Sequence, residues 1–152
     1  MGSPSDIRMI DVTKKPVTRR QAIAKGRLVM QASTLSLLKE GNLPKGDALA
    51  AARLAGIMAA KETHRLIPLC HPLLIDDVDM EISVDKKSSA VEITATVKGS
   101  GKTGFEMEAL TAVAISALTI YDMCKAVDSK MRLENVRLVK KSGGKSGTVA
   151  LE

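Results

Sequence analysis

Aromatic residues are almost missing from this chain of 152 residues, which contains one Phe, one Tyr and no Trp. Surfaces that bind single-stranded nucleic acid stack bases on aromatic side chains, so this composition argues against such a partner. Hydrophobic residues nevertheless make up 45% of the chain. We therefore expect an aliphatic core in a single domain spanning residues 1–152. Residues 1–8 are expected to form a flexible tail, and residues 142–152 a mobile C-terminal segment.

Cysteine and long apolar runs are scarce as well. The two cysteines, Cys70 and Cys124, could form at most one disulfide. No apolar run has membrane-spanning length, and no secretory leader is expected, so the sequence predicts a reduced, cytoplasmic protein without a membrane partner. His64 and His71 complete the set of potential soft metal ligands, but no CxxC or HExxH spacing gathers them, so no metal site is expected.

Charge is unevenly distributed along the chain, whose net charge is +6. Two segments are strongly basic; they contain Lys14, Lys15, Arg19, Arg20, Lys25 and Arg27 near the start, and Lys130, Arg132, Arg137, Lys140, Lys141 and Lys145 near the end. Residues 76–85 are rich in acids. The pattern is consistent with two solvated faces of opposite sign, and equally with a pocket for a polyanion.

Residue patterns predict an alternating order of strands and helices. Strands are expected at 17–30, 76–85, 90–98 and 132–139, and helices at 32–39, 45–67 and 107–127. Asp47 is placed to cap the second helix, whose many small residues permit close packing. A short polar connection at 86–89 favours an antiparallel hairpin, so the fold class is α+β, with an antiparallel sheet packed on helices.

The stretch at 66–73, Leu-Ile-Pro-Leu-Cys-His-Pro-Leu, sets a thiol and an imidazole between two prolines. Pro68 and Pro72 favour a stiff, extended connection after a helix, which would present His71 in a fixed geometry. Neighbours in an extended chain point to opposite sides, so Cys70 and His71 are poorly placed to share a proton.

The helix expected at 107–127 is apolar almost all round, so its few charges require explanation. Asp122 and Lys125 are three residues apart and can interact, either as a structural ion pair or as acid and base partners in a cleft. Glu106 and Glu108 lie more than ~20 Å from Asp122 along the helix. Both ends can serve one small substrate only if another chain closes the pocket.

Two Gly-Lys-Ser/Thr fragments, at 101–103 and 144–146, invite comparison with a P-loop. A P-loop needs a further glycine five residues before the Gly-Lys pair, where this chain has Thr96 and Val139. We therefore do not expect a P-loop. The loop at 141–145 could still close over an anion, or it could be an ordinary mobile tail.

Three long motifs resemble one family. KGDALAAARLAGIMAAKETHRLIPLCHPL, TGFEMEALTAVAISALTIYDMCKAVD and KSGGKSG are similar to the molybdenum-cofactor biosynthesis protein C family, the cyclic pyranopterin monophosphate synthases. The resemblance runs from about residue 9 to residue 147. One departure is Phe105, which stands where the family has a smaller aliphatic residue before Glu-Met-Glu.

The resemblance implies a ferredoxin-like α+β fold and a homohexamer built as a trimer of dimers, with each active site at a subunit interface. It implies conversion of 3′,8-cyclo-7,8-dihydroguanosine 5′-triphosphate into cyclic pyranopterin monophosphate with release of pyrophosphate, by acid and base catalysis without a cofactor. The implied catalytic residues are Lys45, His71, Asp122 and Lys125. The implied substrate-binding residues are Arg20, Leu69, Cys70, His71, Glu106, Met107, Glu108 and Lys141.

An alternative from another class uses the two basic segments. A basic oligomeric scaffold or nucleic-acid-binding protein would bind its partner through these lysines and arginines, and the binding would fall steeply with salt. An enzyme of the implied kind would instead bind small guanine triphosphates saturably.

Overall fold

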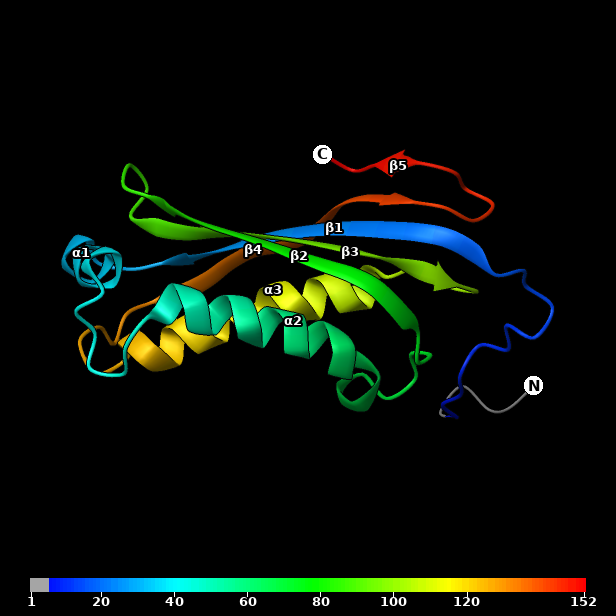
Figure 1. Cartoon of the computed structure of the whole chain (residues 1–152), viewed down its shortest axis with the longest axis horizontal. Coiled ribbons are helices and arrows are strands. Elements are labelled where there is room, and N and C mark those ends of the chain that lie inside the picture. Colours follow the sequence, from blue (N-terminus) through cyan, green and yellow to red (C-terminus); the bar gives the residue numbers. More distant parts are fainter. Residues whose placement is uncertain (1–5) are drawn as a thin grey trace.

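The computed structural model describes residues 6–152 as a twisted antiparallel sheet with two long helices on one face (Figure 1). The elements in chain order are β1 (Thr18–Val29), α1 (Ala32–Glu40), α2 (Ala48–Leu66), β2 (Leu74–Asp85), β3 (Ala90–Gly101), α3 (Glu106–Cys124), β4 (Arg132–Ser142) and β5 (Val149–Ala150). Residues 1–5 of the predicted N-terminal tail lie outside the described residues.

The strands form one sheet in the order β2-β3-β1-β4-β5, and every neighbouring pair is antiparallel. The first four strands thus have the order of a ferredoxin-like fold, and the α+β prediction is confirmed. The two basic segments fall largely on the neighbouring strands β1 and β4, where Ala22 pairs with Lys141. The acidic residues lie on β2 at the opposite edge, so the sheet has a basic side and an acidic side.

The predicted helix boundaries need correction at two ends. The predicted helix at 107–127 is too long, because α3 ends at Cys124, whose carbonyl accepts from the backbone N–H groups of Val127 and Asp128. The predicted start at residue 45 is too early. Helix α2 begins at Ala48 because Asp47 caps it, accepting a hydrogen bond from Ala50 N at 3.0 Å. Lys45 therefore lies on the α1–α2 loop, where no helical geometry constrains its side chain.

The C-terminal segment contains a strand that the sequence pattern did not predict. Strand β5 pairs with β4 through Val149 and Ala150, opposite Lys141 and Lys140. Arg137 also donates hydrogen bonds to both carboxylate oxygens of Glu152, at 3.1 and 2.7 Å. The mobility expected for residues 142–152 stays a prediction.

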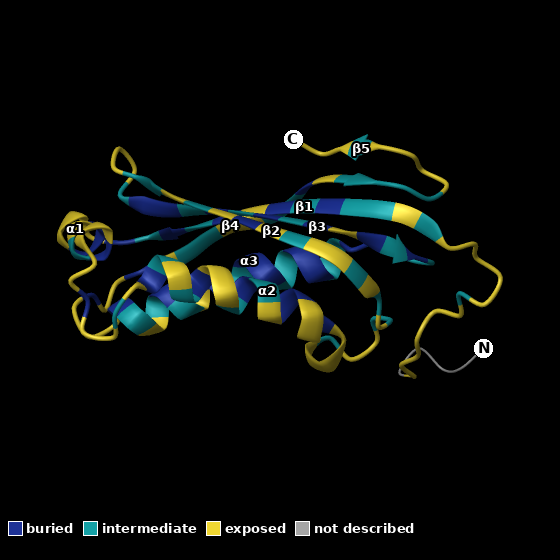
Figure 2. Ribbon diagram, viewed as in Figure 1, coloured by how far each residue is buried: buried dark blue, intermediate teal, exposed yellow. Residues whose placement is uncertain are grey.

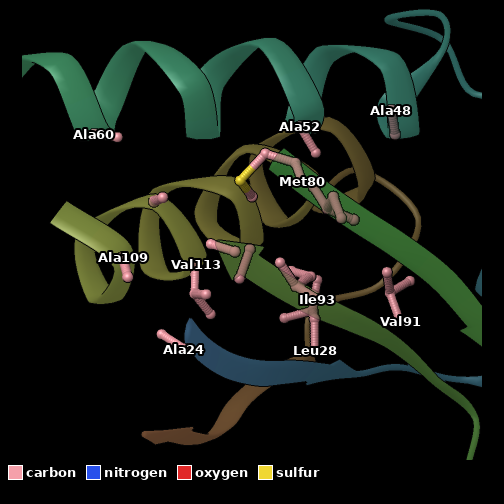
Figure 3. Packing of buried hydrophobic residues seen from close by; sticks show 14 of the residues in the cluster. Ala24, Leu28, Ala48, Ala52, Ala60, Met80, Val91, Ile93, Ala109 and Val113 are labelled. Atoms are coloured by element: carbon pink, nitrogen blue, oxygen red, sulfur yellow. The ribbon is translucent and has the colours of Figure 1, made fainter. Parts of the chain in front are cut away.

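The core is aliphatic apart from the fully buried Phe105, and it lies between the sheet and the helix pair, as the buried faces in Figure 2 show. Close packing depends on small residues: a Cβ added at Gly56 of α2 would lie 2.6 Å from Met80 Cε and 3.3 Å from Ala112 O. Figure 3 shows the Met80 side chain extending from β2 between the two helices. The small residues of α2 thus bring it close to both α3 and the sheet.

Helix α3 is the most apolar of the three described helices, long and apolar enough by length and composition to cross a membrane. Its inward residues Ala109, Val113 and Ile120 are fully buried in the core. Packing of α3 against the sheet and α2 explains this composition, because a helix buried on most sides is apolar on most sides. Helix α3 also carries a cluster of charged residues at each end, and these clusters form parts of the candidate site.

Candidate active site

The first group of charged side chains lies at the C-terminal end of α3 and comprises Lys45, Asp122 and Lys125, which we call the lysine–aspartate cluster. Lys45 Nζ donates to Asp122 Oδ2 at 2.8 Å, and Lys125 Nζ lies 2.9 Å from Asp122 Oδ1. All three side chains are about half exposed. One carboxylate thus holds two ammonium groups, one from each side, in a position open to a ligand.

The electrostatics of this cluster fix its protonation at neutral pH. Hydrogen bonds from Lys45 and then Lys125 lower the pKa of Asp122 to about 2. Asp122 in turn raises the pKa of Lys125. Asp122 is therefore ionised and Lys125 is protonated near pH 7, and with Lys45 the three residues carry a net positive charge. Such a group can attract an anionic substrate and donate a proton to it.

The second group lines a cavity of about 710 Å³ at the other end of the molecule, which we call the basic cavity. Its lining residues are Lys15, Pro16, Thr18, Arg20, Thr103, Gly104, Glu106, Lys141, Ser142, Gly143, Gly144, Lys145 and Ser146. Arg20 and Lys141, one from each basic segment, are brought together because β1 and β4 pair. Their charges suit a phosphate-bearing ligand.

The position of Arg20 is fixed by two consecutive backbone carbonyl groups. Its Nε donates to Gly101 O at 3.2 Å and its Nη2 donates to Lys102 O at 3.3 Å. The turn at 101–103 thus supplies carbonyl acceptors to an arginine, a use different from the amide cradle of a P-loop. The guanidinium is oriented before any ligand arrives.

The glycine-rich loop at 142–147 wraps around Arg20. A Cβ added at Gly144 would lie 2.5 Å from Arg20 Nη1, and one added at Gly143 would lie 2.2 Å from Arg19 O. Both glycines also have positive φ, 75° at Gly144 and 99° at Gly143. Only glycine permits this close approach, so the Gly-Gly pair gives the basic cavity its shape on this side.

The third group gathers at the N-terminal end of α3. Glu108 is only 4% exposed, and burial, with a smaller contribution from Glu106, raises its pKa to about 7. Burial and the neighbouring Glu108 also raise the pKa of the Cys70 thiol. Cys70 is therefore a neutral thiol near pH 7, while Glu108 exchanges its proton in that range.

His71 is anchored by the N-terminal segment. Its Nε2 lies 2.7 Å from Ile10 O. Because a carbonyl oxygen only accepts, Nε2 carries the proton and donates it in this bond. Lys102 Nζ donates to Thr13 O at 3.3 Å, which holds the same segment at a second point. Leu69 is exposed and Met107 is half-buried.

One chain does not bring all the candidate residues together. Glu106 and Glu108 begin α3 and Asp122 lies in its last turn, so at ~1.5 Å per residue they are more than ~20 Å apart. Figure 1 shows the α1–α2 loop at one end of the helix pair and the residues that follow α2 at the other. The lysine–aspartate cluster and the basic cavity therefore lie at opposite ends of the molecule.

Within residues 6–152, no three His, Cys, Asp or Glu side chains are grouped so that they could hold a metal ion. Cys70 and Cys124 are free thiols. The candidate site residues described above carry ammonium, carboxyl, imidazole, guanidinium and thiol groups.

Comparison with known proteins gives consistent matches. Residues 9–144 match the MoaC family. Over 140 residues the chain is 60% identical to the "Cyclic pyranopterin monophosphate synthase" of Parvibaculum lavamentivorans, covering 92% of this chain and 88% of the relative. The proteins of the same name from Chloroflexus aurantiacus and Heliobacterium modesticaldum are 59% and 58% identical, each across 92% of this chain and 86% and 88% of their own lengths.

Proposed function

Because the chain belongs to the MoaC family, we propose that it is a cyclic pyranopterin monophosphate synthase of molybdenum cofactor biosynthesis. Its substrate is 3′,8-cyclo-7,8-dihydroguanosine 5′-triphosphate, and its products are cyclic pyranopterin monophosphate and pyrophosphate. The observation that carries the chemical part of this proposal is the contact of Asp122 with two lysine ammonium groups.

The triphosphate binds in the basic cavity. Arg20 and Lys141 are the principal cations there, and Lys15 and Lys145 add positive charge at the rim. Arg20 is held through Nε and Nη2. Its Nη1 therefore stays available to the phosphate, next to Gly144. The charges of this cavity favour a ligand of high negative charge over a neutral nucleoside.

Proton transfers use the lysine–aspartate cluster. Lys125 is protonated near pH 7, and its 2.9 Å contact with Asp122 holds the ammonium group in position to serve as the general acid. Asp122 orients both ammonium groups and stabilises their charge, while Lys45 contacts the reacting part of the substrate. These steps require no metal or organic cofactor.

The substrate base and sugar contact the N-terminal end of α3 and the connection that precedes β2. Leu69, Cys70, His71, Met107 and Glu108 supply this surface. Glu108, with a pKa of about 7, can accept or return a proton at the working pH. His71 exchanges its bond with Ile10 O for a bond to substrate, so the N-terminal segment has to move when substrate enters.

Each complete pocket is formed by two copies of the chain in a homohexamer, a trimer of dimers in the cytoplasm. The opposite placement of the two charged groups supports this arrangement. A second support is apolar surface on the helix layer, where Leu54, Met58 and Leu118 are 60%, 56% and 49% exposed. Exposed apolar residues gathered on one layer are typical of an interface between subunits.

The proposal is tested by incubating the protein with freshly prepared cyclic dihydro-GTP. Pyrophosphate and the pterin product should appear in equal amounts. An intact oligomer that forms neither product would refute the proposal. A preparation that instead binds nucleic acid with a steep salt dependence would favour the scaffold alternative.

A further inference from the structure

We propose that Asp128 is a positioning residue for the lysine–aspartate cluster, fixing α1 against the end of α3 so that the α1–α2 loop delivers Lys45 to Asp122. The functional meaning of this role rests on the proposed function, but the structural role can be measured without turnover.

Asp128 is a buried carboxylate with a full set of partners. It is 3% exposed. Oδ2 accepts from Gln31 N and from Thr34 Oγ1, both at 2.9 Å, and Oδ1 accepts from Lys130 N at 2.9 Å. Burial alone would raise the pKa of this carboxyl, but these hydrogen bonds lower it below its usual value. Asp128 is therefore buried as a charged group, and such burial is costly unless hydrogen bonds compensate it.

Two of these partners belong to the start of α1. Gln31 is the N-cap of that helix, and its own side chain makes no capping hydrogen bond. Asp128 comes to this helix end from 97 residues away and places a negative charge at the positive end of the helix dipole. The start of α1 is thereby joined to the turn that follows α3.

Both connections from Asp128 to the cluster are short. On one side, Asp122 precedes Asp128 by six residues. The backbone N–H of Asp128 donates to Cys124 O at 3.1 Å, which fixes the turn after α3. On the other side, α1 has nine residues and is capped at its C-terminal end by Gly41, and the buried Leu43 anchors the loop just before Lys45. Each path is held by backbone hydrogen bonds or by burial.

These connections form a closed circuit. Hydrogen bonds join Asp128 to the start of α1, and the backbone leads from α1 to Lys45. Lys45 contacts Asp122 at 2.8 Å, and the backbone leads from Asp122 back to Asp128. Figure 1 shows α1, the α1–α2 loop and the end of α3 at the same end of the molecule. The Lys45 side chain is about half exposed, so packing of its own does not fix it. Its position depends on the two ends of the loop that carries it.

The test measures the titration of the Asp122 carboxyl group by carbon NMR in the Asp128→Asn variant. An asparagine offers one acceptor oxygen and sets an NH₂ group against either Lys130 N or Gln31 N, so it cannot hold both segments. We expect Lys45 to leave Asp122 and the pKa of Asp122 to rise from about 2 toward its usual value. The kcat should fall at least about tenfold while KM changes less, as for a misplaced catalytic group.

Asp85→Asn is the matched control, because Asp85 also accepts from backbone N–H groups, those of Lys87 and Ser88, at the β2–β3 turn. It should leave the Asp122 titration and kcat unchanged. If Asp128→Asn does not fold, Thr34→Val removes one donor and should raise the pKa of Asp122 by a smaller amount. The proposal is overturned if Asp122 titrates as in the parent in a folded Asp128→Asn variant. The same outcome in Thr34→Val would overturn it where Asp128→Asn does not fold. Because the titration needs no substrate, its outcome is independent of the proposed function.

Discussion

Lys45 and Asp122 lie 77 positions apart in the sequence, yet their Nζ and Oδ2 atoms are 2.8 Å apart. Lys125 occupies the second oxygen of the same carboxylate at 2.9 Å. An ordinary ion pair at a helix end needs one cation, so a second lysine on the other oxygen favours acid and base chemistry over a purely structural role. This arrangement leads to the first prediction.

Replacing Lys125 with Met should lower kcat at least about a hundredfold, because the substitution removes the proton donor but keeps the length of the side chain. Lys130→Met is the matched control, since Lys130 is also exposed beyond α3 and its hydrogen bond to Asp128 comes from the backbone N–H, which the substitution keeps. The charge of its side chain is the smallest of the influences that lower the pKa of Asp128. Both variants should assemble as the parent does. Turnover by Lys125→Met close to that of Lys130→Met would remove Lys125 from the mechanism.

A second prediction concerns the glycine-rich loop. Gly144→Ala should raise KM for the triphosphate, because the new Cβ would lie 2.5 Å from Arg20 Nη1 and displace the guanidinium. Gly147→Ala is the control: Gly147 has a similar positive φ of 61°, but nothing lies within 4 Å of its added Cβ. Steady-state kinetics of the two variants separate backbone strain from contact with Arg20. Equal KM values in both would show that Arg20 does not bind the triphosphate.

The buried Glu108 predicts a specific dependence of stability on pH. Its pKa is about 7 in the folded chain, against 4.5 for the ordinary side chain. Between these values the folded state binds more protons than the unfolded state, so the free energy of unfolding falls as pH rises. At ~1.36 kcal/mol per unit, the loss approaches about 3 kcal/mol above pH 7.

Glu108→Gln lacks this titration, so the variant should be more stable than the parent at pH 8, and the difference should disappear near pH 4. Denaturant unfolding at several pH values measures the difference in the free energy of unfolding between the two proteins. Glu81→Gln, at an exposed position of β2, should follow the parent at every pH. A Glu108→Gln curve that runs parallel to the parent across this range would contradict the raised pKa.

Local patterns in the sequence predict most of the fold. The alternation of Val78, Met80, Ile82 and Val84 identifies β2, and in the structure these side chains are buried or partly buried against the core. The Asp47 cap is correct because it acts on the next turn of its own helix. Periodicity and capping succeed where the deciding contacts are close in sequence.

Contacts between distant residues are what the sequence does not reveal. Strand β5 has two residues and exists because β4 lies beside it, so no periodicity could indicate it. Lys45 contacts Asp122 from a distant segment, and Gln31 likewise bonds to Asp128. The bond from His71 goes to a backbone atom, Ile10 O, which no side-chain pattern can indicate. The burial of Glu108 had only a weak signal, its spacing of four residues from Ala112 on the buried face of α3, because the exposed Asp122 is a carboxylate of the same apolar helix.

The central claim is that two copies of the chain complete each pocket, since Arg20 and Asp122 lie at opposite ends of one molecule. The most direct measurement mixes an Arg20→Ala chain with an Asp122→Ala chain, after dissociation and reassembly, and follows formation of the pterin product. Each variant alone should be inactive, and the mixture should recover a fraction of parent activity, because some pockets then combine an intact Arg20 with an intact Asp122. A mixed oligomer without activity would contradict the shared pocket.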